Sequence, residues 1–164
     1  MKRNILTLII AVFALTQAAA QTYDNLWKQA DIIARKDQPR SEIGVMKKII
    51  SKASAAKDYG QLLAAEMRQM ILWKEISADS LMPNVERMEA EVLKVKDPAV
   101  KAVRYAVLGK VYRDMNEKKS EEFFKKALQQ PELLAKHTST EYVPLTLKGV
   151  DGSSFNNDLL HLIG

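Results

Sequence analysis

The sequence predicts an all-α protein built from stacked antiparallel helical hairpins. Between Tyr23 and Gln130, apolar residues recur at spacings of three and four, which is the period of helices that bury one face. Prolines and capping residues divide this stretch into six segments. The connections are only a few residues long, so successive helices must turn back on one another.

Each predicted helix carries its own set of apolar positions, which we expect to form the core. In chain order these are Leu26, Ala30 and Ile33; Ile43, Met46, Ile50 and Ala53; Leu63, Met67 and Met70; Val85, Met88 and Val92; Val100, Val103, Val107 and Val111; and Phe124, Ala127 and Leu128.

The helix starts have their own signals. Pro39 and Pro98 suit first-turn positions, where the missing N–H costs little. A short polar side chain can accept a hydrogen bond from the first turn and so cap the helix. The expected caps are Asp58 for the third helix, Ser80 with Pro83 for the fourth, Asp97 for the fifth and Ser120 for the sixth.

The last predicted hairpin carries a narrower pattern. Leu108-Gly109-x-x-Tyr112, followed by Phe124-x-x-Ala127-Leu128 and Pro131, resembles the tetratricopeptide repeat. In that pattern Gly109 lets the two helices approach, Tyr112 and Phe124 fill the space between them, and Ala127 admits the next hairpin. Ser120 stands where the repeat usually has Ala, and the earlier hairpins lack the signature. We therefore expect a short tetratricopeptide-like solenoid over residues 21–137.

After Pro131 the pattern changes. Residues 133–136 can extend a short helix, which Thr138-Ser139-Thr140 ends. Tyr142–Leu147 is interpreted as extended chain, because Pro144 restricts it to an edge or a linker, and Asp151-Gly152 predicts a turn. The residues from Ser153, ending in Asp158–Gly164, are typical of a further amphipathic helix. Its leucines would have little cover, so we interpret 138–164 as a linker and helix start that continue in a longer protein.

The N-terminus predicts export. Lys2 and Arg3 precede an apolar run over Ile5–Leu15, and Ala18-Ala19-Ala20 supplies the small residues that a signal peptidase recognises. The run covers only about half of a hydrocarbon core roughly 30 Å thick, so a permanent anchor is the weaker interpretation. We expect residues 1–20 to be a cleaved signal peptide and the rest to be periplasmic or associated with the cell envelope.

Composition excludes several classes of function. The chain has no Cys, which rules out a disulfide framework, an iron–sulfur cluster and a cysteine nucleophile. Without the signal peptide, 23 positive residues stand against 20 negative ones and are interleaved with them, which does not favour nucleic-acid binding. No glycine-rich phosphate loop is present. No cofactor and no small-molecule substrate is therefore expected, and membrane association would come only through a partner or another domain.

Two histidines are candidate site residues. Asp158 and His161 would share one helix face and offer two metal ligands, but two ligands do not make a site, so a cap at Asp158 is preferred. His137 beside Thr138, Ser139 and Thr140 contains a possible base and nucleophile, without a nucleophile elbow or an oxyanion loop. We predict no catalytic, cofactor-binding or metal-binding residue and no enzymatic activity.

Glutamates and methionines leave two further alternatives. Paired glutamates can act as general acid and base, but among Lys and Arg on amphipathic helices they favour solvated salt bridges; these are Glu66, Glu75, Glu86, Glu89 and Glu91. Methionines can line an adaptable peptide groove, but at helical spacing core packing is preferred; these are Met46, Met67, Met70, Met82, Met88 and Met115.

Three segments carry a family resemblance: Tyr23–Gln29, then Lys36-Asp37-Gln38-Pro39, then Asp58–Leu63. They resemble the N-terminal helical region of large exported bacterial alpha-2-macroglobulin-like proteins, and Leu147–Gly152 with Asp158–Gly164 is similar to the place where that region continues. The resemblance implies that the chain is part of a protease-trapping inhibitor. The β-sandwich domains, bait segment and Cys–Gln thioester of such inhibitors are not in this sequence. No functional residue is carried over.

Export, hairpins and the resemblance together predict a non-enzymatic scaffold or docking module, the N-terminal part of an alpha-2-macroglobulin-like protease inhibitor. The alternative is a free-standing periplasmic tetratricopeptide-like adaptor that holds a protein or peptide partner on its helices.

Overall fold

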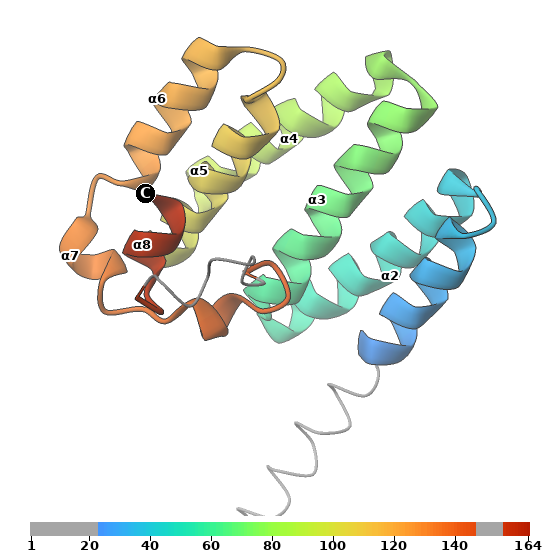
Figure 1. Cartoon of the computed structure of the whole chain (residues 1–164), viewed down its shortest axis with the longest axis horizontal. Coiled ribbons are helices and arrows are strands. Elements are labelled where there is room, and N and C mark those ends of the chain that lie inside the picture. Colours follow the sequence, from blue (N-terminus) through green and yellow to red (C-terminus); the bar gives the residue numbers. More distant parts are fainter. Residues whose placement is uncertain (1–22, 147–155) are drawn as a thin grey trace, which may run out of the picture.

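The computed structural model describes residues 23–146 and 156–164. The predicted signal peptide and the predicted Asp151-Gly152 turn lie outside these residues. Figure 1 shows the elements in chain order. They are a helix over residues 23–34, α2 (Pro39–Ala56), α3 (Tyr59–Ile76), η1 (Ala78–Ser80), α4 (Leu81–Lys94), α5 (Pro98–Tyr112), α6 (Glu117–Ala127), α7 (Pro131–Leu134), η2 (Ser139–Tyr142) and α8 (Leu159–Ile163).

The predicted all-α architecture of helical hairpins is confirmed. The most extensive contacts join α2 to α3 and α5 to α6, and each pair runs antiparallel (Figure 1). The α4 helix contacts both α3 and α5 and so connects the two pairs. Short connections force this arrangement, because a helix that follows within a few residues can bury its apolar face only against its predecessor.

The predicted apolar positions form the core. Every one of them is buried or half-buried, and none is exposed. Met46, Ile49 and Ala53 of α2 pack between the helix over residues 23–34 and α3. A second cluster joins α3 to α6 around Val85 and Leu108. The period of three and four therefore placed the buried faces correctly.

Most predicted helix starts are also confirmed. Pro39 and Pro98 lie in the first turns of α2 and α5. The Asp58 carboxylate accepts a hydrogen bond from the Gln61 N–H, and that of Asp97 accepts from Ala99 and Val100.

Two predicted caps differ from the structure. Ser80 precedes α4, but its side chain makes no capping hydrogen bond. The prediction that Ser120 caps the sixth helix is wrong: α6 begins at Glu117, and Asn116 caps it by accepting from the Lys119 N–H at 3.0 Å. Ser120 lies inside α6 instead, where its hydroxyl donates to the Gly109 carbonyl oxygen at 2.7 Å.

The α5–α6 interface corrects one detail of the repeat-like pattern. Gly109 does allow close approach, because the ring of Phe124 lies against it: a Cβ atom there would come 2.9 Å from the ring. The residue that stacks on Tyr112 is Phe123, not Phe124, with ring centroids 5.6 Å apart. Phe123 is buried and Phe124 is half-buried.

The prediction of an extended Tyr142–Leu147 segment is wrong over its described part. Residues 139–142 form η2, and a turn containing a cis Val143–Pro144 peptide follows. The Thr146 N–H donates to the Tyr142 carbonyl and the Thr146 hydroxyl donates to the Ser139 carbonyl, so local hydrogen bonds close the segment on itself. Burial of the Tyr142 ring in a cluster with Leu63 holds this turn against α3.

The expectation that the last leucines lack cover is wrong for Leu159, whereas Leu162 is 44% exposed. Leu159 of α8 is fully buried in the cluster that contains Leu63 and Tyr142. Two backbone hydrogen bonds hold α8 in place: Ser139 N–H to Asn157 O and Leu159 N–H to His137 O, each at 2.9 Å. The C-terminal residues thus pack beside α5 and α7 (Figure 1).

Candidate functional site

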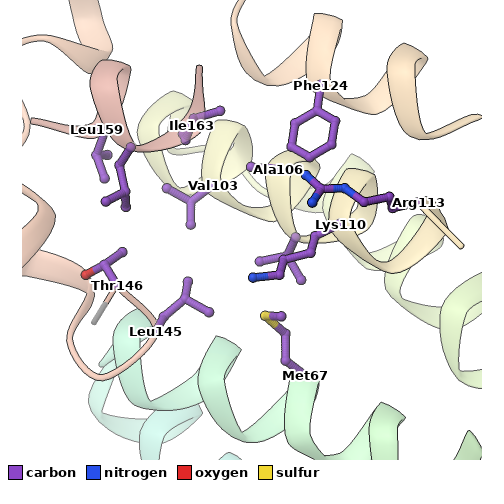
Figure 2. Close-up of a pocket in the computed structure, with 12 residues that line it drawn as sticks. Met67, Val103, Ala106, Lys110, Arg113, Phe124, Leu145, Thr146, Leu159 and Ile163 are labelled. Carbon is purple, nitrogen blue, oxygen red and sulfur yellow. The ribbon is translucent and has the colours of Figure 1, made fainter. Parts of the chain in front are cut away.

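The C-terminal packing leaves an apolar cavity of about 240 Å³. Figure 2 shows its walls: α5 contributes Val103 and Ala106, α3 contributes Met67, the turn after η2 contributes Leu145, and α8 contributes Ile163. These segments are far apart in sequence, and the cavity exists because the turn and α8 stop short of covering α5 between Val103 and Arg113.

Two cations enter this apolar cavity. Lys110 and Arg113 both extend from α5 into the opening (Figure 2). No Asp or Glu lines the cavity, and among the described residues no ion pair joins either cation to an acidic side chain. The Arg113 guanidinium lies 5.9 Å from the centroid of the Phe124 ring, a cation–π contact that leaves its charge uncompensated.

A second cavity, of about 190 Å³, adjoins the first, because Met67 and Lys110 line both. We call the two cavities together the α3–α5 groove. The remaining lining residues of the second cavity are Met70, Ile71, Lys74, Leu81, Val111, Asp114 and Met115.

Three of the seven exposed large apolar side chains among the described residues line this groove. Leu162 in the first cavity is 44% exposed, and Ile71 and Met115 in the second are 55% and 36% exposed. Large apolar side chains that remain this accessible around a hollow are typical of binding surfaces.

The structure divides the methionines between the two interpretations. Met46 and Met88 are core residues. Met67, Met70 and Met115 line the groove, although Met70 is itself buried. The alternative of an adaptable Met-lined surface therefore fits part of the group.

Two arginines elsewhere in the fold, Arg68 and Arg104, have acidic partners. Arg68 bonds to Glu42 and lies 3.0 Å from Asp31, beside a separate cavity of about 440 Å³. Arg104 lies 3.3 Å from Glu66. Lys110 and Arg113 differ from these two arginines in having no such partner among the described residues.

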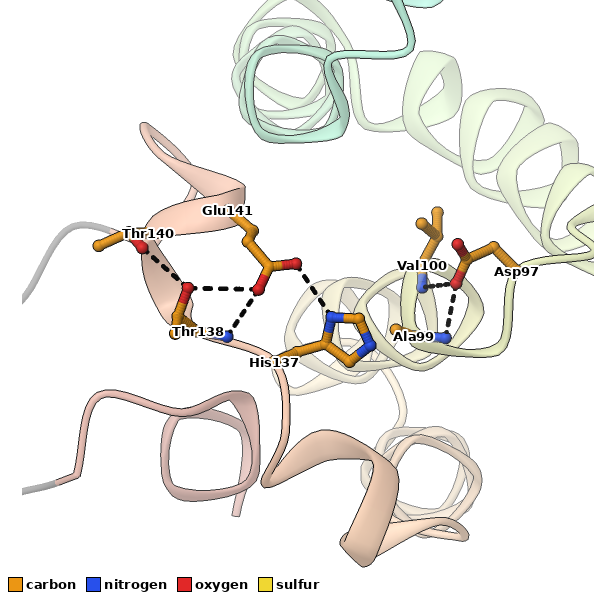
Figure 3. Close-up of polar contacts among 7 residues, drawn as sticks. All are labelled: Asp97, Ala99, Val100, His137, Thr138, Thr140 and Glu141. Atoms are coloured by element: carbon orange, nitrogen blue, oxygen red, sulfur yellow. Dashed lines mark hydrogen bonds and ion pairs between the residues drawn. The ribbon is translucent and has the colours of Figure 1, made fainter.

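His137 belongs to a local capping arrangement, shown in Figure 3. Its Nδ1 lies 2.9 Å from Glu141 Oε2, and Glu141 also accepts from the Thr138 N–H and hydroxyl, which is a capping box at η2. These hydrogen bonds, from His137 first, lower the pKa of Glu141. The hydroxyls of Thr138 and Thr140 bond to each other and Thr138 to the carboxylate, so neither hydroxyl bonds to the imidazole that would have to activate it.

His161 and Asp158 meet as their spacing predicted. The Asp158 carboxylate caps α8 by accepting from the His161 N–H at 2.9 Å, and it lies 2.8 Å from His161 Nδ1. The same contacts, the backbone N–H first, lower the pKa of Asp158. Across residues 23–146 and 156–164, no third His, Asp or Glu joins them to form a metal-binding group.

The glutamates are only partly solvated. Glu91 pairs with Arg87 on the surface of α4 as expected. Glu66 is wrongly predicted as solvated: it is buried opposite Arg104, and burial raises its pKa while Arg104 acts in the opposite direction. Glu89 accepts from the Tyr112 hydroxyl and from Lys119 Nζ, which ties α4 to the α5–α6 hairpin.

Sequence reasoning missed the groove, although one signal was present. The sequence of α5 has apolar residues on more than one face, which predicts a helix that packs on two sides. One side is filled by α4 and α6, and the other is only partly covered by α3 and α8.

No family model, curated protein or solved structure matches this chain. The described residues include no helix with the length and apolar character needed to span a bilayer. The groove itself is therefore the main guide to function.

Proposed function

We propose that this chain is an exported, non-enzymatic helical docking module that holds a segment of a partner protein in the α3–α5 groove. One observation carries the proposal: an apolar hollow, built from several separate parts of the chain, contains exposed apolar side chains and two cations without ion-pair partners among the described residues. Both cations are exposed at the opening, so they are accessible to an acidic group of a bound segment.

The N-terminal segment and the family resemblance support a proposal for the larger protein to which the module belongs. We propose that the module is the N-terminal part of an alpha-2-macroglobulin-like protease inhibitor, in which protease trapping belongs to other domains. The free-standing periplasmic adaptor remains the second form of the proposal, and the same groove supports it. Reading the gene beyond codon 164 and measuring the size of the product in envelope fractions would distinguish the two forms.

Site-specific photo-crosslinking in the envelope tests the docking function. A photo-reactive phenylalanine analogue at Ala106 would lie inside the groove, and the same analogue at Lys48 on the exposed face of α2 is the matched control. We expect discrete protein adducts from position 106 and not from position 48. Equal adducts at both positions, or none at position 106, would contradict docking through the groove.

A further inference from the structure

The positions of the charges along the groove indicate the chemistry of its occupant. Val103 of α5 lines the first cavity, Met115 in the turn after α5 lines the second, and Lys110 of α5 lines both. At about 1.5 Å per helical residue, Lys110 lies about 10 Å along α5 from Val103, and the groove continues past the end of α5 to Met115. Lys110 therefore lies where the two cavities meet, and most of the residues that line each cavity are apolar. The other charged lining residues are Arg113 in the first cavity and Lys74 and Asp114 in the second.

The position of the positive charge between two cavities distinguishes between classes of ligand. A fatty acid, or a peptide anchored by its terminal carboxylate, carries its negative charge at one end, so one of the two apolar cavities would be left unfilled. A protein segment can place an acidic side chain between apolar ones. At roughly 3.3 Å per residue, about three residues of extended chain cover the distance from Val103 to Lys110, and a few more reach into the second cavity.

We propose that the α3–α5 groove binds a protein segment in which an Asp or Glu lies between large apolar residues, with its carboxylate held by Lys110 and Arg113. This inference rests on the proposed docking function and adds the chemistry of the partner. Arg113 can bind a carboxylate through two parallel N–H donors, and Lys110 adds a point charge from one helical turn away. The apolar flanks would fill the cavities beside Val103 and Met70.

Selection from a library tests the inference. Random peptides of about twelve residues, displayed on phage, are selected on the purified full chain and on four variants. Lys110→Gln with Arg113→Gln removes the charge, Ala106→Trp fills the first cavity, Leu162→Asp is a second block at an exposed position, and Lys48→Gln is the matched charge control. Circular dichroism melts verify that each variant is folded, and Leu162→Asp replaces Ala106→Trp if the latter is not.

We expect the wild-type chain and Lys48→Gln to enrich peptides with an acidic residue flanked by large apolar ones. The charge variant should lose the acidic preference, and the blocked variants should lose enrichment altogether. In a binding titration, replacing the acidic residue of a selected peptide by its amide should raise Kd about tenfold, since a hydrogen bond to a charged group is lost.

The unfavourable outcomes are distinguishable. Enrichment of apolar peptides without an acidic preference, abolished by the groove block, would overturn this inference and leave docking standing. Absence of enrichment, or enrichment that the groove block does not change, would contradict both. A dimer in sedimentation that the groove block dissociates would make a second copy of the chain the occupant and would overturn the acidic segment.

Discussion

Gly60 lies where the backbone of α3 meets the turn after η2. A Cβ atom here would come 2.3 Å from the Val143 carbonyl oxygen and 2.6 Å from the Tyr142 carbonyl carbon. Both are backbone atoms, so no side-chain rotation can relieve the clash. We expect Gly60→Ala to lower the free energy of unfolding by about 2–3 kcal/mol, measured by urea denaturation.

Gly44 in the middle of α2 provides the matched control. A Cβ atom there would meet nothing within 4 Å. Gly44→Ala should therefore raise the free energy of unfolding by about 0.5–1 kcal/mol, because alanine restricts the unfolded chain and favours the helix. Similar effects of the two substitutions would show that the turn does not pack on α3 as described.

The lowered pKa of Glu141 predicts a pH dependence. A carboxyl whose pKa is lower in the folded state stabilises the fold above its unfolded pKa, and this contribution is lost as pH falls through the folded pKa. We expect Glu141→Gln to lower the free energy of unfolding at pH 7 by well under about 1 kcal/mol, because the side chain is half exposed, and so to lower Tm slightly. At pH 3 the same substitution should change Tm little. An equal loss of Tm at both pH values would contradict the capping role of the charge.

The helix caps show how far single residues in the sequence can predict local structure. The caps at Asp58 and Asp97 were predictable because each residue immediately precedes a segment with helical apolar spacing. A short polar side chain at that position caps the helix. Ser120 was misassigned because it lies within the same polar stretch as Asn116, and both can cap. Only the packing of α6 on α5 decides between them, since it places the Ser120 hydroxyl against the Gly109 carbonyl.

At the level of elements, the ion pair between Glu66 and Arg104 joins α3 to α5. The side chains are 5% and 8% exposed, and Arg104 Nε has no hydrogen-bond partner in the described structure. Desolvation of both charges offsets most of their attraction, so the pair contributes little net stability. Removing one partner has a different effect, because it leaves a buried charge alone.

A double-mutant cycle checks this prediction. Arg104→Met alone should lower the free energy of unfolding by about 3–5 kcal/mol, because Glu66 would then be buried without its partner. Adding Glu66→Leu should recover most of that loss, since two apolar side chains can fill the same space. A double variant no more stable than Arg104→Met would mean that the pair itself is a major source of stability.

The helices were predictable and some of their contacts were not. The apolar period fixes which face of each helix is buried, but it assigns similar roles to the adjacent residues Phe123 and Phe124. Their difference depends on the rotation of α6 over Gly109. In the same way, Pro144 excluded a central strand correctly, yet the choice of a turn over an extended chain came from the burial of Tyr142 against α3.

At the level of the whole molecule, the groove depends on the return of the C-terminal residues to the helical layer. Its walls come from α3, α5, the turn after η2 and α8. The periodicity of one segment cannot predict a cavity whose walls come from several segments. The sequence did identify residues that line the groove, namely methionines at helical spacing and the final group of leucines. It did not predict that Leu159 would be buried while Leu162 stays accessible.

With these two leucines, the contribution of α8 to stability can be measured separately from its contribution to peptide binding. Leu159 is fully buried, so Leu159→Ala should lower the free energy of unfolding by about 2–4 kcal/mol. Leu162 is 44% exposed and lines the groove, so Leu162→Ala should change stability by less than about 0.5 kcal/mol. The same change should weaken binding of a library-selected peptide about tenfold, since the side chain would be buried only in the complex.

Urea denaturation and peptide titration on both variants test these two predictions. If Leu162→Ala left peptide affinity unchanged while Leu159→Ala had the expected effect on stability, α8 would support the fold without contributing to the binding surface.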